Sequence, residues 1–170
     1  MRWLKKSGGP RQGAGTSIDI TRLQRELGVR IGERGSTTLT LACGEMNRTK
    51  HHELGAEHLI VGVLEEGGPA AQLLLEHGLT LDGVRAEIAE ALWETDDAPE
   101  KVGLTAEASN ILATAAEAAG MRGHREIEPE HITYGFVCSG FEITSRVLHM
   151  IGVDRQKLLQ DAEQLLSNGR

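Results

Sequence analysis

The sequence predicts an all-α protein made of two copies of one helical unit. Three observations indicate this: an internal duplication, an apolar composition with few aromatic residues, and apolar residues that recur with helical spacing. Hydrophobic residues make up 39% of the 170 residues but aromatic residues only 3%. The core must therefore consist of Leu, Ile, Val and Ala, and because aromatic residues are enriched in strands, this composition favours helices over sheets.

The duplication is clearest around two Glu-His pairs. Residues 55–62 read Gly-Ala-Glu-His-Leu-Ile-Val-Gly, and residues 128–135, which start 73 positions later, read Glu-Pro-Glu-His-Ile-Thr-Tyr-Gly. The match continues downstream with one inserted residue, in a short connection where a helical fold accepts it. Each unit is about seventy residues long, which predicts a pseudo-symmetric pair packed together rather than an open array of repeats.

Apolar periodicity and end signals predict four helices in each copy and no strand. Pro69 and Pro129 each stand at a helix start, where the missing N–H has no helical partner to lose. The expected helices run from about residue 34 to 50, over 56–65, over 69–78 and from Thr80 to Trp93 in the first copy, and from Thr105, from Pro129, over 141–151 and from Asp154 in the second.

The chain divides into a basic segment and a helical domain. Residues 1–31 are expected to be largely flexible, with a short helix over 19–28. Residues 32–168 are the domain, with repeat one over 32–95, a linker over 94–103 and repeat two over 104–168. The linker has no apolar period and contains a proline.

Charge is distributed unevenly along the chain. The net charge is −7, yet the first fifty residues contain ten Lys or Arg and four Asp or Glu. A basic N-terminal segment is typical of a solubilising tail, and contact with nucleic acid is the alternative. Residues 23–29 resemble the first half of a helix-turn-helix, but the second helix would contain Gly32 and Gly35, each costing about 1 kcal/mol relative to Ala.

Composition and spacing also indicate the compartment. Cys43 and Cys138 have neither metal-site nor disulfide-framework spacing, which is typical of reduced, buried thiols. No stretch approaches the length of a membrane span, and the charged residues 1–6 are not followed by the apolar run of a signal peptide. We therefore expect a cytoplasmic protein with no membrane partner.

The motifs of enzymes are absent from the sequence. No Gly-x-Ser-x-Gly elbow occurs, and the glycine-rich residues 8–15 lack the lysine and preceding strand of a nucleotide-binding loop. His52 is followed four positions later by Ala56, so the second ligand of a zinc-protease helix is missing. The sequence therefore predicts no enzyme, cofactor or metal, with adventitious chelation by His51, His52 and His58 as the alternative.

A family resemblance rests on the ordered motifs of both copies. Leu-Thr-x-x-Ala at residues 104–108, Glu-His 25 residues after the threonine, and a Leu-rich helix ending in Gly-Val occur in that order, and a whole second copy accompanies them. Over roughly residues 32–168 the sequence resembles the N-terminal domain of the Clp (Hsp100) ATPases, particularly the ClpC type. The resemblance implies a compact all-α domain that recruits adaptors and substrates for an ATP-driven unfoldase and its protease.

The resemblance also implies two binding sites. In members that read arginine phosphorylation, the glutamate of each Glu-His pair takes the guanidinium and a Thr-led helix start holds the phosphate, as expected for a carboxylate and a helix N-terminus. This assigns one site to Thr105 with Glu130 and another to Gly32 with Glu57, the latter lacking the threonine hydroxyl. The same spacing fits glutamates that only stabilise the first turn of a helix.

The histidines that follow the two glutamates, His58 and His131, are expected to pack inside each repeat and bond a backbone carbonyl rather than a metal.

The sequence thus favours a non-enzymatic protein- or peptide-binding module, one that feeds or sequesters ligands of a Clp protease system. Its expected partners are Clp adaptors or substrates and Clp ATPase or protease components. The alternative is a ligand-sensing regulator that contacts DNA through its basic N-terminal segment, in a salt-sensitive manner. The oligomeric state is not predicted.

Overall fold

The computed structural model describes residues 17–91 and 102–168, which form nine helices and four two-residue strands. Residues 1–16 of the predicted N-terminal segment, most of the linker and Trp93 lie outside the described residues. In chain order the elements are α1 (Ile20–Leu27), β1 (Arg30–Ile31), α2 (Glu33–Arg48), β2 (Glu53–Leu54), α3 (Ala56–Glu66), α4 (Pro69–Glu76), α5 (Leu81–Ala91), β3 (Gly103–Leu104), α6 (Ala106–Met121), β4 (Glu126–Ile127), α7 (Pro129–Cys138), α8 (Glu142–Ile151) and α9 (Arg155–Asn168).

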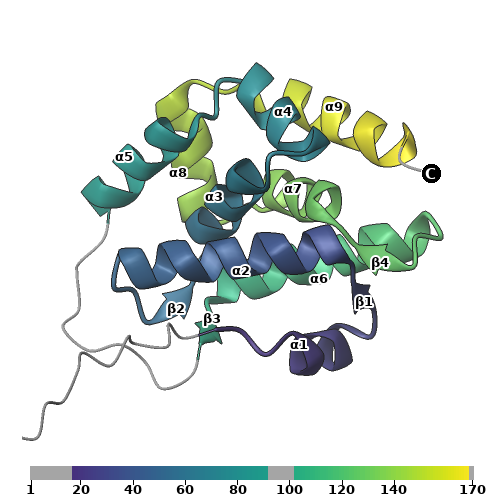
Figure 1. Ribbon diagram of the computed structural model, residues 1–170. Helices are drawn as coiled ribbons and strands as arrows, with labels where there is room; N and C mark the ends of the chain where they lie inside the picture. The colour runs from purple at the N-terminus through teal and green to yellow at the C-terminus, as the bar shows by residue number, and fades with distance from the viewer. Residues whose placement is uncertain (1–16, 92–101, 169–170) are drawn as a thin grey trace, which may run out of the picture.

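The predicted pair of four-helix repeats is confirmed, with α2 to α5 as one repeat and α6 to α9 as the other (Figure 1). Helix ends follow local chemistry. The Asp19 carboxylate accepts a hydrogen bond from the Arg22 amide at the start of α1, and Gly28 ends that helix in the left-handed conformation. At the start of α9, the Asp154 carboxylate accepts a hydrogen bond from the Lys157 amide at 3.1 Å.

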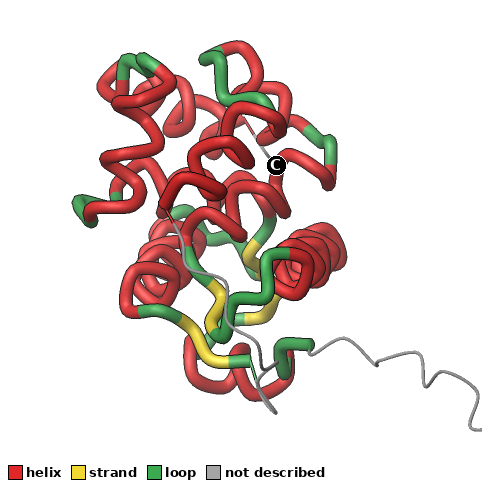
Figure 2. Tube along the Cα trace, turned by 90° about the vertical axis from the view of Figure 1, so that its left-hand side faces the viewer, coloured by secondary structure: helices red, strands yellow, loops and turns green. Residues whose placement is uncertain are grey.

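The prediction that the chain has no strand is wrong in detail. Four short strands form two parallel pairs, β1 with β4 and β2 with β3. In these pairs Arg30 lies opposite Glu126, and Glu53 lies opposite Gly103. Figure 2 shows the strands (yellow) in the lower part of the molecule, beside the helix starts. Each pair joins the two repeats, so the start of each repeat's first helix lies against the start of the other repeat's second helix.

The core is centred on α3 and α7, which pack on each other in the middle of the molecule (Figure 1). All residues of α3 from Ala56 to Val63 are buried. A Cβ atom on Gly62 would clash with the Thr38 carbonyl of α2, and one on Gly135 would clash with the Ile111 carbonyl of α6. The same close helix contact is thus present in both repeats.

The outer helices pair across the repeats, α4 with α9 and α5 with α8. The buried Glu45 joins α2 to α5, since its carboxylate accepts hydrogen bonds from Arg48 and Arg85. Burial alone would raise the pKa of Glu45, but the two guanidinium groups outweigh it and hold the pKa at about 2. None of the described helices is both long enough and apolar enough to cross a membrane.

Candidate functional site

All four residues predicted to bind ligand lie at two equivalent places where the repeats meet. We call these the Gly32 end, where the starts of α2 and α7 meet, and the Thr105 end, where the starts of α6 and α3 meet. The Gly32 amide donates to the Ile127 carbonyl at 2.9 Å, and the Thr105 amide donates to the Leu54 carbonyl at 3.1 Å.

The predicted grouping of these residues is therefore wrong. The sequence assigned Thr105 to Glu130 and Gly32 to Glu57, each pair within one repeat. The structure places Gly32 at the end that contains Glu130, and Thr105 at the end that contains Glu57. Because the strands pair between repeats, each end combines residues from both copies.

The two helix starts are capped in different ways. At the Thr105 end, the Thr105 hydroxyl accepts the Ala108 amide at 3.1 Å. At the Gly32 end, the equivalent amide, that of Gly35, donates instead to the Glu128 carboxylate of the other repeat at 2.8 Å. A Cβ atom on Gly32 would clash with that carboxylate, so the glycine makes room for it. Each first helix thus has one side-chain acceptor, taken either from its own repeat or from the partner repeat.

Glu130 is paired with an arginine of the chain itself. Arg34 Nη1 donates to the Glu130 carboxylate at 2.8 Å. The same guanidinium donates through Nε and Nη2 to both oxygens of Glu66, at 2.8 and 2.9 Å. The hydrogen bonds from Arg34 lower the pKa of Glu66 against the opposing effect of its burial. No sequence pattern predicts this three-residue contact, since Arg34 and Glu130 are 96 positions apart.

Glu57 has no cationic partner among the residues that the structure describes. The residue is 4% exposed, and its Oε2 atom has no hydrogen-bond partner. Burial raises the pKa of Glu57 to about 7, and the nearby charge of Glu107 adds to the effect. Glu107 stands at the position equivalent to Arg34, and it accepts hydrogen bonds from the backbone and hydroxyl of Thr144. Within the described part of the chain, the Thr105 end therefore contains two buried carboxyl groups and no guanidinium.

Two histidine pairs support the starts of α3 and α7. Nε2 of His58 lies 2.7 Å from Nδ1 of His51, and Nε2 of His131 lies 2.8 Å from Nδ1 of His124. Nδ1 of His58 accepts the Gly55 amide, and Nδ1 of His131 accepts the backbone amide of Glu128. Because Nδ1 is an acceptor, the proton of each neutral ring is on Nε2 and points at the second histidine. The predicted bond to a backbone carbonyl is therefore wrong.

Both capping histidines are neutral over the physiological range. Burial, together with the neighbouring histidine, lowers the pKa of His58 to about 3 and that of His131 to about 4. The 3.3 Å contact between His58 Nδ1 and the Glu57 carboxylate is consequently not an ion pair.

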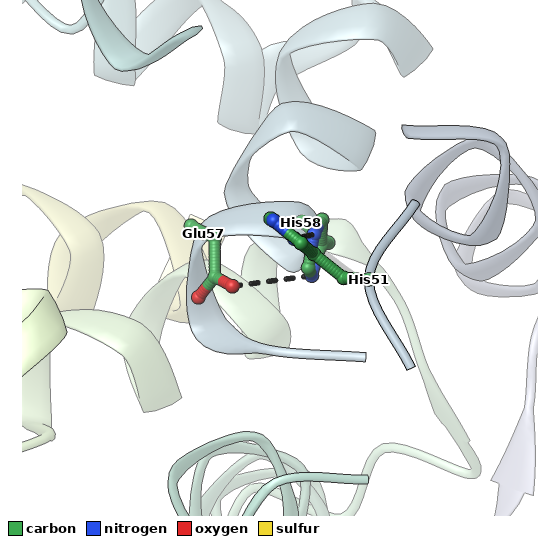
Figure 3. A group of neighbouring side chains, drawn as sticks. All are labelled: His51, Glu57 and His58. Carbon is green, nitrogen blue, oxygen red and sulfur yellow. Dashed lines mark hydrogen bonds and ion pairs between the residues drawn. The ribbon is translucent and has the colours of Figure 1, made fainter. Parts of the chain in front are cut away.

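His51, Glu57 and His58 are close enough together to be considered as metal ligands, with ligand atoms within 4.8 Å of one another (Figure 3). Their orientation does not suit one ion. Glu57 approaches the Nδ1 atom of His58, which already accepts the Gly55 amide, whereas His51 approaches Nε2 on another edge of the ring. An ion held by both histidines would thus lie away from Glu57. The group fits a helix-capping histidine pair better than a metal centre.

A pocket of about 540 Å³ opens beside the Gly32 end. Charged side chains from three elements meet there with the apolar end of α9. Its lining residues include Arg34, Arg125, Glu128, Glu130, Leu165 and Leu166.

These features define a class of protein: a helical domain of two interlocked repeats with charged groups at two equivalent helix starts. Residues 103–170 match the family model of the Clp repeat (R) N-terminal domain. Over 140 residues the chain is 30% identical to the negative regulator of genetic competence ClpC/MecB of Bacillus subtilis and 29% identical to the chaperone protein ClpB of Oceanobacillus iheyensis. Each match covers 82% of this chain and 17% of the relative.

Solved structures give the same result. The N-terminal domain of ClpD from Arabidopsis thaliana matches with a TM-score of 0.69 and 21% identity, over 82% of this chain and 96% of that one. The Hsp104 N-terminal domain from Candida albicans matches with a TM-score of 0.72 and 10% identity, over 83% of this chain and 94% of that one. The second half of the chain is therefore a Clp N-terminal repeat, and the chain as a whole has the fold of Clp N-terminal domains. The resemblance predicted from the sequence is confirmed.

Proposed function

We propose that the chain is a non-enzymatic module that binds proteins or peptides and brings adaptors or substrates to a Clp unfoldase. The Clp N-terminal repeat and the shared fold support this proposal. A further similar structure, with a TM-score of 0.61 and 16% identity, is a complex of the ClpV N-domain with a VipB peptide. A peptide is thus bound by one domain of this fold.

For the ligand itself, we propose an arginine-phosphorylated segment bound at the Thr105 end. The observation that carries this proposal is the buried Glu57 carboxyl group, which has one oxygen without a hydrogen-bond partner. A guanidinium fork would supply donors to that oxygen and return the carboxyl to its charged form. The start of α6, where Thr105 stands, would take the negative phosphate, because helix N-termini favour anions.

The depth of Glu57 sets a requirement for this binding. At 4% exposure, its carboxylate must turn outward from Gly55, against which it is folded. Gly55 has no side chain to obstruct this movement. The ion pair formed with the ligand would offset the cost of the movement, since the free carboxyl is held in an unfavourable environment.

Titration of a phosphoarginine peptide against wild type and Glu57→Gln tests the proposal. We expect the variant to bind at least about tenfold more weakly, since hydrogen bonds to charged groups are each worth about 1.5–3 kcal/mol. Glu142→Gln is the matched control, because Glu142 is an exposed glutamate in the first turn of α8. If Glu57→Gln binds as tightly as wild type, the peptide does not bind at Glu57. If wild type does not bind the peptide, the proposal of phosphoarginine recognition is wrong, and only the proposal of adaptor binding remains.

A further inference from the structure

A groove lies between α1 and α6, on the lower side of the molecule in Figure 1, where the described chain begins and runs to α1. Its volume is about 430 Å³, within the range of about 300–1,000 Å³ that is typical of ligand pockets. We call it the α1–α6 groove. Its lining combines apolar side chains with two glutamates and includes Leu27, Val29, Ala113, Ala116, Glu26 and Glu117.

The α1–α6 groove is open, and part of its negative charge is unpaired. A Cβ atom on Gly120, which also lines the groove, would meet no atom within 4 Å. Glu117 is exposed and forms no hydrogen bond or ion pair with any residue that the structure describes. Leu27 and Val29 are only partly buried, so apolar surface remains between the helices. The groove therefore suits a bulky apolar side chain that is flanked by cations.

The first six residues of the chain have this composition. Residues 1–6 read Met-Arg-Trp-Leu-Lys-Lys, so Trp3 and Leu4 stand between an arginine and two lysines. Residues 1–16, which lie outside the described part of the chain, contain four Lys or Arg and no Asp or Glu. A tryptophan offers a large apolar surface, of about 150–250 Å² when buried. We call residues 1–6 the Trp3 segment.

The chain is long enough to bring the Trp3 segment to the groove. Trp3 is 14 positions before Ser17, where the described chain begins, and an extended chain spans at most about 3.3–3.6 Å per residue, so the reach is about 45–50 Å. Ile18 and Ile20 pack against the core and fix the start of this connection beside α1. A connection of this length gives an effective concentration in the millimolar range, so a groove with a Kd of about 100 µM would be about nine-tenths occupied.

We propose that the Trp3 segment docks in the α1–α6 groove of its own chain, with Trp3 and Leu4 on the apolar surface and the flanking cations near Glu26 and Glu117. The contact is independent of the proposed function, because none of the residues that line the groove belongs to the Gly32 end or the Thr105 end. Docking places the positive charge of the N-terminal segment on the acidic helical domain and withdraws it from contact with nucleic acid.

Tryptophan quenching tests the docking in the full chain. The chain has two tryptophans, so Trp93→Phe leaves Trp3 as the only one, and a peptide of residues 1–16 supplies the undocked reference. We expect acrylamide to quench Trp3 at least about twofold less in the chain than in the peptide, because a docked indole is partly buried. The protection should be the same from about 1 to 100 µM protein, since the contact is intramolecular.

Two variants in this background test the place of docking. Gly120→Met fills the groove and Glu117→Lys reverses its charge, so each should raise the quenching of Trp3 to the level of the peptide. Gly44→Met is the matched control, because Gly44 stands 73 positions before Glu117, at the equivalent place on α2, and also faces open space. This control should leave Trp3 protected. Circular dichroism verifies the fold of each variant, and should one of the two groove variants misfold, the other decides.

Equal quenching of Trp3 in the chain and in the peptide would overturn the proposal, and so would protection that survives both groove variants. Protection that grows with protein concentration would show that a second copy receives the segment. Protection that appears only when duplex DNA is added would show contact with nucleic acid. Both of these results contradict docking within one chain.

Discussion

At the scale of single residues, Glu57 contributes a stability that depends on pH. Its pKa is raised to about 7 in the folded chain by burial and by Glu107, from an ordinary value near 4.5. The folded state therefore retains a proton that the unfolded state has released. The contribution is fully present below about pH 4.5 and is lost as the pH rises through about 7.

Replacing this carboxyl group with a neutral amide should remove this decrease of stability at high pH. We expect Glu57→Gln to raise the free energy of unfolding at pH 8 by up to about 3 kcal/mol relative to wild type, and to change it little at pH 4. Urea denaturation at both pH values measures the difference, with Glu142→Gln as the control. A gain that is the same at both pH values would contradict the assigned cause.

The capping histidines give the opposite dependence. The pKa of His131 is lowered from 6.5 to about 4 by burial and by His124, so the unfolded state binds more protons between these values. Stability is present above pH 6.5 and is lost as the pH falls towards 4. His131→Asn preserves an acceptor for the Glu128 amide but cannot be protonated.

We expect this variant to show a smaller decrease of unfolding free energy between pH 6.5 and 4 than wild type. His149→Asn, at an exposed position of α8, should leave the decrease unchanged. Denaturation series at several pH values would detect the difference. If the free energy of unfolding falls equally with pH in His131→Asn and wild type, the pH dependence does not come from His131.

At the scale of elements, the close contact of α2 with α3 and of α6 with α7 depends on a glycine. Gly62→Ala and Gly135→Ala each place a Cβ atom against a backbone carbonyl that cannot move aside. We expect each to destabilise the protein by about 1–3 kcal/mol, as overpacking does. Gly44→Ala, in α2 with open space around it, should instead stabilise by up to about 1 kcal/mol. Thermal denaturation of the three variants tests this, and a neutral Gly135→Ala would refute the contact.

The helices were predictable from the sequence because their signals are local. Pro69, Pro129, Thr105 and Asp154 each mark a helix start by a capping or dihedral property of that residue. The strands were not predictable, since two residues are too few to show an alternating pattern. Their pairing depends on how the repeats pack, and so does the grouping of Gly32 with Glu130 and of Thr105 with Glu57.

Part of the site did have a signal in the sequence. In the duplication, Glu128 is equivalent to Gly55, and Thr105 is equivalent to Gly32. At each of these two positions, one repeat therefore has a glycine and the other has a side-chain acceptor. Such a complementary exchange is expected when a cap moves from one repeat to the other. Arg34 had no comparable signal, because its partner positions follow only from the three-dimensional arrangement.

At the scale of the whole molecule, the repeats are interlocked rather than merely adjacent. Both strand pairs, the α3–α7 contact and the outer helix pairs join one repeat to the other. We expect residues 102–170 alone to unfold without cooperativity, because β4 loses its strand partner β1 and α9 loses its contact with α4. Addition of residues 17–101 should restore helical circular dichroism and a single urea transition. A cooperative transition of the isolated fragment would show that the repeats are independent.

The molecule thus presents two related ends with unequal occupancy, one filled by Arg34 and Glu128 and one with an unpaired buried carboxyl group. Amide chemical-shift mapping with a phosphoarginine peptide tests this asymmetry most directly. The predicted result is a set of shifts at residues 103–108 and 55–57, with residues 32–35 unaffected. Shifts confined to residues 32–35 and 128–131 would contradict it, because the peptide would then have chosen the end that the chain itself occupies.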